Sequence, residues 1–273
     1  MQRFGGRLGS VPPVVLNLLI INILVYFGSS LAEGTGFDMT RYFALYYPGS
    51  EFFRPHQFIT HMFMHGGLTH LFFNMFALWM FGKVLESVWG AKRFLFYYFV
   101  TGLGAALLHT LVIWFQAGNL ANDAQALINT PSPDVFAMFI KENFPKLQSE
   151  VAPFISSWID APSNPAYINE ATNFVDRLVS MKMNVPTVGA SGAVFGVLLA
   201  FGMLFPNTRL MLLFPPIPIK AKWFVIGYGA IELFAGVMNQ PGDNVAHFAH
   251  LGGMIFGFVL IKYWNKTQRN KFY

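Results

Sequence analysis

Residues 94–115 read FLFYYFVTGLGAALLHTLVIWF, 22 consecutive positions without a single Asp, Glu, Lys or Arg. About 20 apolar residues are enough for an α-helix to cross the roughly 30 Å hydrocarbon core of a bilayer. A helix also satisfies its own backbone hydrogen bonds where no water is available. We therefore predict a membrane-spanning helix here.

The composition of the whole chain agrees with a membrane protein. Of its 273 residues, 54% are hydrophobic and only 11% are charged, whereas a soluble domain carries about 25% charged residues. This balance excludes an ordinary soluble domain, a disordered chain and a basic DNA-binding protein. The absence of cysteine excludes a disulfide framework and thiolate catalysis. We predict an all-α, polytopic bundle of six transmembrane helices, at about 11–32, 68–87, 94–115, 186–206, 223–240 and 245–262.

The distribution of Lys and Arg orients these spans. Twelve of the 18 lie in the N-terminus, the loops 83–93 and 207–222 and the C-terminal tail, and loops rich in Lys and Arg face the cytoplasm. Eleven of the 13 acidic residues lie in the alternate segments. We therefore expect both termini in the cytoplasm. Because the ten residues before the first span are too few for a transit peptide, a bacterial inner (plasma) membrane is the expected location.

Two extracytoplasmic segments differ from plain connections. Residues 33–67 are rich in aromatic side chains and interrupted by prolines, which predicts a loop half-embedded at the membrane interface. Residues 116–185 are far longer than an ordinary connection and carry apolar residues at helical spacing within 136–151 and 168–178. We expect one membrane domain over 1–273, with a helical insertion whose amphipathic faces lie on the outer leaflet or cap the active-site cavity.

Ionisable and strongly polar side chains are costly inside a bilayer, so they mark candidate functional sites. At 1.5 Å per helical residue, Ser191, His250 and His70 lie about 22, 18 and 20 Å from the cytoplasmic ends of their spans, and Asn74 lies one turn deeper than His70. Three non-adjacent spans thus bring polar groups to nearly the same level. The other such residues are His109, Glu232 and His247.

Ser191 belongs to the small-residue run Gly189–Gly196, which follows Pro186. Proline suits the first turn of a helix, so Ser191 is expected in the first turns of a helix that starts below the outer surface. Unpaired backbone N–H groups and the positive end of the helix dipole then surround it, a setting that stabilises an oxyanion. The alternative interpretation is a seam of small residues that only packs helices.

His250 shares a helix face with Gly253 and Gly257, whose G-x-x-x-G spacing predicts close packing on another helix. Its imidazole is therefore directed towards that partner and not towards lipid, and a histidine beside a serine at equal depth favours a catalytic role over a structural one. His70 and Asn74 are i and i+4 on one helix, point the same way and can both donate hydrogen bonds to an oxyanion. The alternatives are a structural histidine and an interhelical polar clamp.

Together these motifs resemble the rhomboid family of intramembrane serine proteases. The matching pieces are residues 61–75 (HMFMHGGLTHLFFNM), the run Gly189–Gly196 and the run Ala249–Gly257, in the family's order on the second, fourth and sixth spans. The resemblance implies a six-helix rhomboid-type bundle that hydrolyses a peptide bond in or near the outer end of transmembrane protein substrates. It covers the six-span core but not the insertion 116–185.

The resemblance also implies roles for single residues. Ser191 would be the nucleophile and His250 the general base, while His70 and Asn74 would donate to the oxyanion together with the backbone N–H of Ser191. The family histidine that matches His65 has a structural role in the first loop.

The orientation of the general base is expected to come from packing alone. Phe195 stands where the family often has a tyrosine and is expected to stack on His250. No partner is assigned to Glu232, and Asp243 is expected at the outer surface. We therefore predict a Ser–His dyad without a carboxylate and, because such a base is weaker, slow turnover.

Other classes of function fit less well. His61 and His65 have H-x-x-x-H spacing, but Met62 stands where a metalloprotease of the H-E-x-x-H type needs its glutamate. A polytopic transporter would show internal repeats or charged residues along a path, and a catalytically silent rhomboid-like protein commonly lacks the serine or the histidine. We expect no cofactor and no metal. The expected partners are transmembrane protein substrates and the lipid bilayer, with no nucleic acid.

Overall fold

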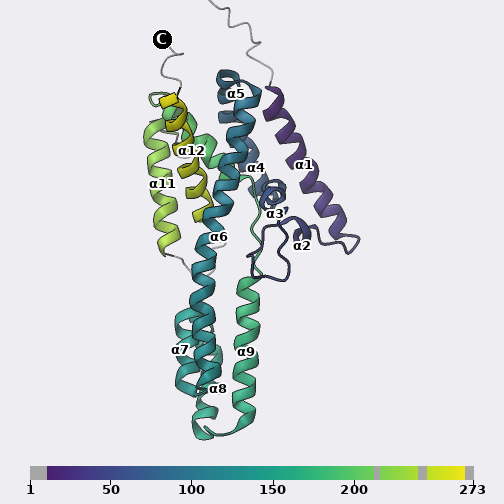
Figure 1. Ribbon diagram of the computed structural model, residues 1–273, viewed down its shortest axis with the longest axis vertical. Coiled ribbons are helices and arrows are strands. Elements are labelled where there is room, and N and C mark those ends of the chain that lie inside the picture. The colour runs from purple at the N-terminus through teal and green to yellow at the C-terminus, as the bar shows by residue number, and fades with distance from the viewer. Residues whose placement is uncertain (1–10, 212–215, 239–244, 268–273) are drawn as a thin grey trace, which may run out of the picture.

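The structure is a computed structural model that describes residues 11–211, 216–238 and 245–267. Long apolar helices gather at one end of an elongated molecule, and shorter helices form a second group at the other end (Figure 1). The long helices are α1 (Pro13–Glu33), α4 (Leu68–Ala77) continued by the π-helical turn η2 (Leu78–Gly82) and α5 (Lys83–Trp89), α6 (Ala91–Asn129), α10 (Ser191–Leu204), α11 (Ala221–Met238) and α12 (His247–Thr267).

Helices occur at all six positions where spans are predicted. By length and composition, four of the described helical segments are able to cross a membrane: α1, residues 68–89, α6 and α11. The helices α10 and α12 are not among these four. The helix α10 is apolar but has only 14 residues, and α12 packs against α6 and α10 within the group of long helices. The chain is therefore a mostly helical, multi-pass integral membrane protein, while the number of six crossings stays a prediction.

Two of the predicted spans differ in their ends from the helices at the same positions. The span predicted from residue 186 begins as a helix only at Ser191, because Thr187 pairs with Leu45 in a short antiparallel bridge and the preceding backbone is extended. The span predicted to end at 115 continues as one helix to Asn129, since its apolar side chains find a second core beyond the predicted span.

The first loop, residues 34–67, is compact. It contains α2 (Met39–Phe43), α3 (Gln57–Thr60) and the 3-10 turn η1 (His61–Phe63). The buried amide of Gln57 holds the loop together: its oxygen accepts from the backbone N–H of Arg54 (3.0 Å), and its nitrogen donates to the carbonyl of Phe52 (2.9 Å). The half-embedding of this loop in the interface stays a prediction.

The insertion packs against itself. It contains α7 (Pro133–Asn143), the 3-10 turn η3 (Pro145–Leu147), α8 (Gln148–Asp160) and α9 (Pro165–Met183). With the far half of α6 these helices bury their own apolar core, centred on Trp158, Phe136 and Leu127. The amphipathic faces were predicted to lie on the outer leaflet or to cap the cavity; in the structure these faces pack against one another, and their contact with the leaflet stays a prediction. We call this unit the extramembrane bundle.

A two-stranded antiparallel hairpin interrupts the helical fold between α10 and α11. Its strands are β1 (Arg209–Met211) and β2 (Pro218–Lys220), with Arg209 opposite Lys220. The α1 helix begins and α12 ends at the same end of the molecule, opposite the extramembrane bundle (Figure 1). This arrangement agrees with the predicted placing of both termini on one side. Among the described residues, the hairpin and the bridge between Leu45 and Thr187 depart from the all-α prediction.

Glycines allow the helices around the predicted site to touch. A Cβ atom on Gly253 would collide with the carbonyl oxygen of Gly192, and one on Gly257 would collide with the hydroxyl of Tyr97. The same hydroxyl donates to the carbonyl of Gly196 at 2.8 Å. The G-x-x-x-G face of α12 therefore packs on another helix as predicted, with α10 and α6 as its neighbours.

We expect Gly253→Ala to lower the stability of the protein by about 1–3 kcal/mol, because the added methyl group must push α12 away from α10. The matched control is Gly227→Ala on α11, since nothing lies within 4 Å of the position of its Cβ. This control should leave stability unchanged or raise it slightly, because alanine is the better helix former. Thermal unfolding in detergent measures both. Equal melting temperatures for the two variants would contradict a close contact between α10 and α12.

Candidate active site

Ser191 is the first residue of α10. The first hydrogen bond of this helix joins the N–H of Val194 to the carbonyl of Ala190 at 3.0 Å, so the N–H of Ser191 precedes the helical ladder. Gly189 has a φ of 126°, and a Cβ there would lie 2.7 Å from Cε1 of His70 and 3.5 Å from Oγ of Ser191. Glycine thus permits the backbone to turn here and leaves the space beside the serine hydroxyl open.

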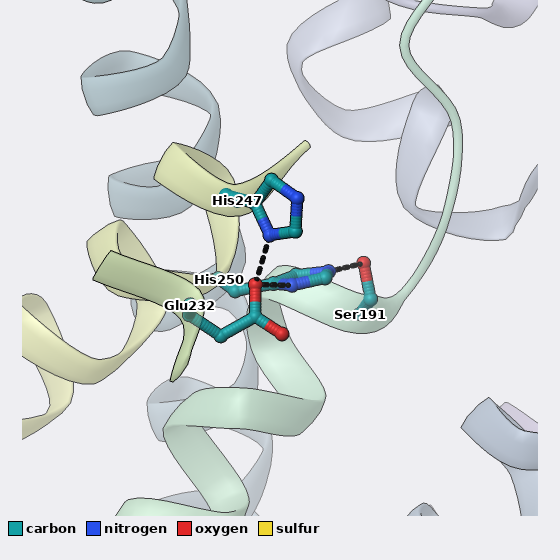
Figure 2. A network of polar contacts seen from close by, with 4 residues as sticks. All are labelled: Ser191, Glu232, His247 and His250. Atoms are coloured by element: carbon teal, nitrogen blue, oxygen red, sulfur yellow. Dashed lines mark hydrogen bonds and ion pairs between the residues drawn. The ribbon is translucent and has the colours of Figure 1, made fainter. Parts of the chain in front are cut away.

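His250 faces Ser191 from α12. Its Nε2 atom lies 2.9 Å from Oγ of Ser191, as Figure 2 shows. The ring of Phe195 stacks on the imidazole with 4.1 Å between centroids and an angle of 6°, as predicted. Tyr228 of α11 packs in turn on the ring of Phe195, with 4.9 Å between the two centroids. The structure therefore brings the predicted nucleophile and base into hydrogen-bond contact.

The prediction of a dyad without a carboxylate is wrong in its geometry. Oε2 of Glu232, on α11, lies 2.8 Å from Nδ1 of His250 and 2.6 Å from Nδ1 of His247 (Figure 2). Glu232 is only 5% exposed. The sequence contained a signal for this contact. Glu232 lies 10 residues from Lys222 and His250 lies 12 from Lys262, so their depths of about 15 and 18 Å differ by less than one helical turn. Asp243, the other acidic residue considered, lies outside the described residues.

His70 and Asn74 enter the same site from α4. Asn74 is buried, and its Nδ2 donates one hydrogen to the carbonyl of His70 at 3.0 Å, which leaves the second amide hydrogen available. The ring of His65 meets that of His70 edge-on, with centroids 5.1 Å apart. The two ring nitrogens of His65 have no hydrogen-bond partner among the described residues. Burial lowers the pKa of His65 to about 4, so this imidazole is neutral at physiological pH.

One large cavity joins these side chains. It has a volume of about 1590 Å³ and is lined by Ser191, His250, His70 and Asn74. The extramembrane bundle also contributes to its lining, through Gln116, Glu142, Asn143 and Lys182. A substrate in this cavity would therefore contact both the reactive pair and polar side chains of the insertion.

Three contacts fix the extended segment in front of Ser191. The backbone of Thr187 exchanges hydrogen bonds with that of Leu45, at 2.8 and 2.9 Å. Its hydroxyl lies 2.9 Å from Nε2 of His109, on α6. The N–H of Gly189 donates to the carbonyl of His61 at 2.9 Å. These tethers were not expected from the sequence. His109 stood out as a polar residue of its span, but no pattern pointed to Thr187.

One group of side chains also has the composition of a metal site. Glu232, His247 and His250 each offer a ligand atom, and these atoms lie within 4.8 Å of one another. A cation there would take the Nδ1 lone pair of His250 and leave the proton on Nε2, so His250 could not accept a proton from Ser191. His61 belongs to no such group among the residues that the structure describes, and its Nδ1 lies 2.8 Å from the carbonyl of Gln57.

These features define a multi-pass helical membrane protein with a partly buried serine–histidine pair that lines a cavity. The chain belongs to the rhomboid family, because the family model described as Rhomboid domain matches residues 51–119 and 156–266. This family includes serine peptidases. The matched ranges contain Ser191, His250, His70 and Asn74, and they leave out the middle of the insertion.

Curated relatives agree with the family. The chain is 29% identical over 204 residues to an uncharacterized mitochondrial rhomboid protein of Schizosaccharomyces pombe, covering 74% of this chain and 48% of the relative. It is 25% identical over 205 residues to the mitochondrial Rhomboid protein 1 of Saccharomyces cerevisiae, covering 75% and 40%. The chloroplastic Rhomboid-like protein 16 of Arabidopsis thaliana is 22% identical over 260 residues, covering 95% and 63%. The chain thus spans about half the length of these relatives.

Proposed function

We propose that this protein is an intramembrane serine endopeptidase with Ser191 as nucleophile and His250 as general base. The observation that carries the proposal is the 2.9 Å contact between Oγ of Ser191 and Nε2 of His250 inside the cavity. A serine hydroxyl is a weak nucleophile until a neighbouring base accepts its proton. The stacked ring of Phe195 holds the imidazole in the plane that this transfer needs.

The reaction proceeds in two halves. Oγ of Ser191 attacks the carbonyl carbon of the scissile bond while its proton passes to Nε2 of His250, and the carbonyl oxygen becomes an oxyanion. When the C–N bond breaks, the same proton goes to the leaving amine and an acyl ester remains on Ser191. A water molecule then gives its proton to His250 and attacks the ester, which releases the new carboxyl terminus and restores the serine.

The oxyanion is stabilised by donors that line the cavity together with Ser191. Its own backbone N–H precedes the helical ladder of α10, where the helix dipole is positive. Asn74 has a second amide hydrogen, and the ring of His70 lies beside Gly189 in the same cavity. Donors arranged in advance around the developing charge supply a large share of enzymatic rate enhancement.

The substrate class follows from the depth of the site. Side chains at this level meet the backbone of another membrane protein, whose helix must unfold locally before a carbonyl is open to attack. We therefore propose transmembrane proteins as substrates, cleaved in or near the outer end of the spanning segment. Both termini are proposed to face the side that carries most of the Lys and Arg. The bacterial inner membrane stays a prediction, and the names of the relatives describe mitochondrial or chloroplastic proteins.

We expect Ser191→Ala and His250→Ala each to abolish cleavage of a transmembrane substrate, because each removes an indispensable half of the reactive pair. The measurement is the appearance of the cleaved fragment after incubation of the purified protein with a model transmembrane substrate. Both variants should keep the wild-type melting temperature, and a metal chelator should leave the rate unchanged. Full activity in Ser191→Ala, or strong inhibition by a chelator, would falsify the serine mechanism.

We expect His70→Ala and Asn74→Ala to lower the rate about 10- to 1000-fold without eliminating it, the range typical for the loss of one oxyanion donor. The backbone N–H of Ser191 still serves the oxyanion in both variants. The measurement is kcat with the same substrate. If both variants cleaved at the wild-type rate, His70 and Asn74 would form a structural clamp and their assignment to the oxyanion would have to be dropped.

We expect the extramembrane bundle to select substrates without taking part in the chemistry, since its polar side chains line the cavity. Replacing residues 120–182 with a short Gly/Ser linker should change the ratio of the rates for two unrelated transmembrane substrates. The labelling of Ser191 by a serine-directed probe should persist. Unchanged rates for both substrates would identify the bundle as a passive insertion.

A point variant sharpens this test. Glu142 lines the cavity whereas Glu150, on the neighbouring helix α8, does not. Glu142→Lys should therefore shift the ratio of the two rates when the substrates differ in charge next to the membrane. The matched control Glu150→Lys makes the same change in net charge and should leave that ratio where it was.

A further inference from the structure

The buried carboxylate of Glu232 contacts the reactive pair on the side away from the serine. Its Oε2 atom lies 2.8 Å from Nδ1 of His250, whose Nε2 lies 2.9 Å from Oγ of Ser191. Figure 2 shows serine, imidazole and carboxylate as one continuous chain of contacts from α10 through α12 to α11. We propose that Glu232 is a positioning residue that completes a Ser191–His250–Glu232 triad, an inference that rests on the proposed function.

The first consequence of this contact is the choice of tautomer. An ionised carboxylate only accepts hydrogen bonds, so Nδ1 of His250 must carry its hydrogen at the 2.8 Å contact with Glu232. Nε2 is then left with a lone pair that faces the hydroxyl of Ser191. Without the carboxylate, the tautomer with the hydrogen on Nε2 gains population, and this form cannot take the proton of Ser191.

The second consequence is electrostatic. When the proton of Ser191 moves to Nε2, His250 becomes an imidazolium that lies between Ser191 and the carboxylate of Glu232. A carboxylate at hydrogen-bond distance in a buried site favours that charged form. No lysine or arginine in the described part of the chain forms an ion pair with Glu232, so its negative charge is not neutralised by a permanent cation. The Nδ1–H stays on His250 throughout, and Glu232 takes no proton.

His247 binds the same carboxylate oxygen and must be separated from this role. It is the first residue of α12, one turn before His250, and its Nδ1 lies 2.6 Å from Oε2 of Glu232. A purely structural reading would make Glu232 a clamp between α11 and α12. In the triad, His247 fixes the orientation of the carboxylate, and the carboxylate in turn orients the imidazole of His250 and stabilises its protonated form. The other titratable groups near the contacts between Ser191, His250 and Glu232 are Tyr228 on α11, His70 on α4 and His109 on α6.

The test compares Glu232→Gln with two controls in the full-length protein. The amide keeps the size of the side chain but removes the charge. His247→Gln removes the second donor and leaves the carboxylate on His250. Glu86→Gln removes another buried carboxylate, one that accepts from the backbone N–H groups of Val14 and Val15 at 3.0 and 2.8 Å, far along the chain from the site. It measures the general cost of neutralising a buried glutamate here.

For Glu232→Gln we expect kcat to fall about 10- to 1000-fold with KM within a factor of about three, because the base is misoriented while the cavity is intact. The acid limb of the pH–rate profile should move to lower pH, since His250 loses the carboxylate that stabilises its protonated form. His247→Gln should lower kcat less than about 10-fold. Glu86→Gln should keep the wild-type kcat and acid limb, whatever it does to the melting temperature.

Several outcomes would overturn the proposal. One is a Glu232→Gln variant with the wild-type kcat and acid limb. Another is an equal loss of kcat in Glu232→Gln and His247→Gln that parallels a loss of melting temperature and leaves the acid limb in place. That result would identify Glu232 as a structural clamp between α11 and α12. If Glu232→Gln does not fold, Glu232→Asp is the second variant, because it keeps the negative charge but moves it away from Nδ1 of His250. An undiminished kcat in Glu232→Asp equally excludes the triad.

A readout independent of peptide cleavage separates this proposal from the proposed function. The rate at which a fluorophosphonate labels Ser191 reports the basicity and orientation of His250 without any protein substrate. If no transmembrane substrate is cleaved but labelling slows in Glu232→Gln and not in Glu86→Gln, the endopeptidase proposal fails and the triad stands. If substrates are cleaved in a Ser191-dependent manner and labelling is the same in both variants, the triad fails and the endopeptidase stands.

Discussion

The contact between α10 and α12 is the constraint on which the rest of the site depends. The Cα of Gly253 approaches the carbonyl of Gly192 so closely that no side chain fits between them. Ser191 precedes that carbonyl by one residue, and His250 precedes Gly253 by one turn, so this backbone contact sets the separation of the two reactive atoms. Inside a bilayer the hydrophobic effect does not press helices together. The close contact at Gly192 and Gly253 therefore holds the two helices at the fixed separation that a hydrophobic core would provide in a soluble hydrolase.

Much of the fold could be predicted from single segments of sequence. Runs such as 94–115 reveal a span because the bilayer demands about 20 apolar residues from each crossing, independent of what the neighbours do. The reactive pair was predictable for a related reason. Ser191 and His250 are costly in a membrane, lie at matched depth and are flanked by small residues, so the local pattern alone pointed to a shared site.

The features that the sequence did not reveal depend on pairing between distant segments. The bridge between Leu45 and Thr187 joins residues that are far apart in the chain, and it delays the start of α10 to Ser191. The far half of α6 continues because α7, α8 and α9 return to cover it. Glu232 was left without a partner because α11 has no motif of its own, although its depth matched that of His250. Depth should therefore be compared for every charged residue of a span, with or without a motif beside it.

The uninterrupted length of α6 has a consequence outside the membrane. Its 39 residues form a rod of about 58 Å, roughly twice the thickness of the hydrocarbon core. The extramembrane bundle packs on the far half of this rod, and some of its side chains line the cavity that holds Ser191. If transmembrane proteins are the substrates, as we propose, an ectodomain that is folded at the bilayer surface would meet the bundle as its helix approaches Ser191.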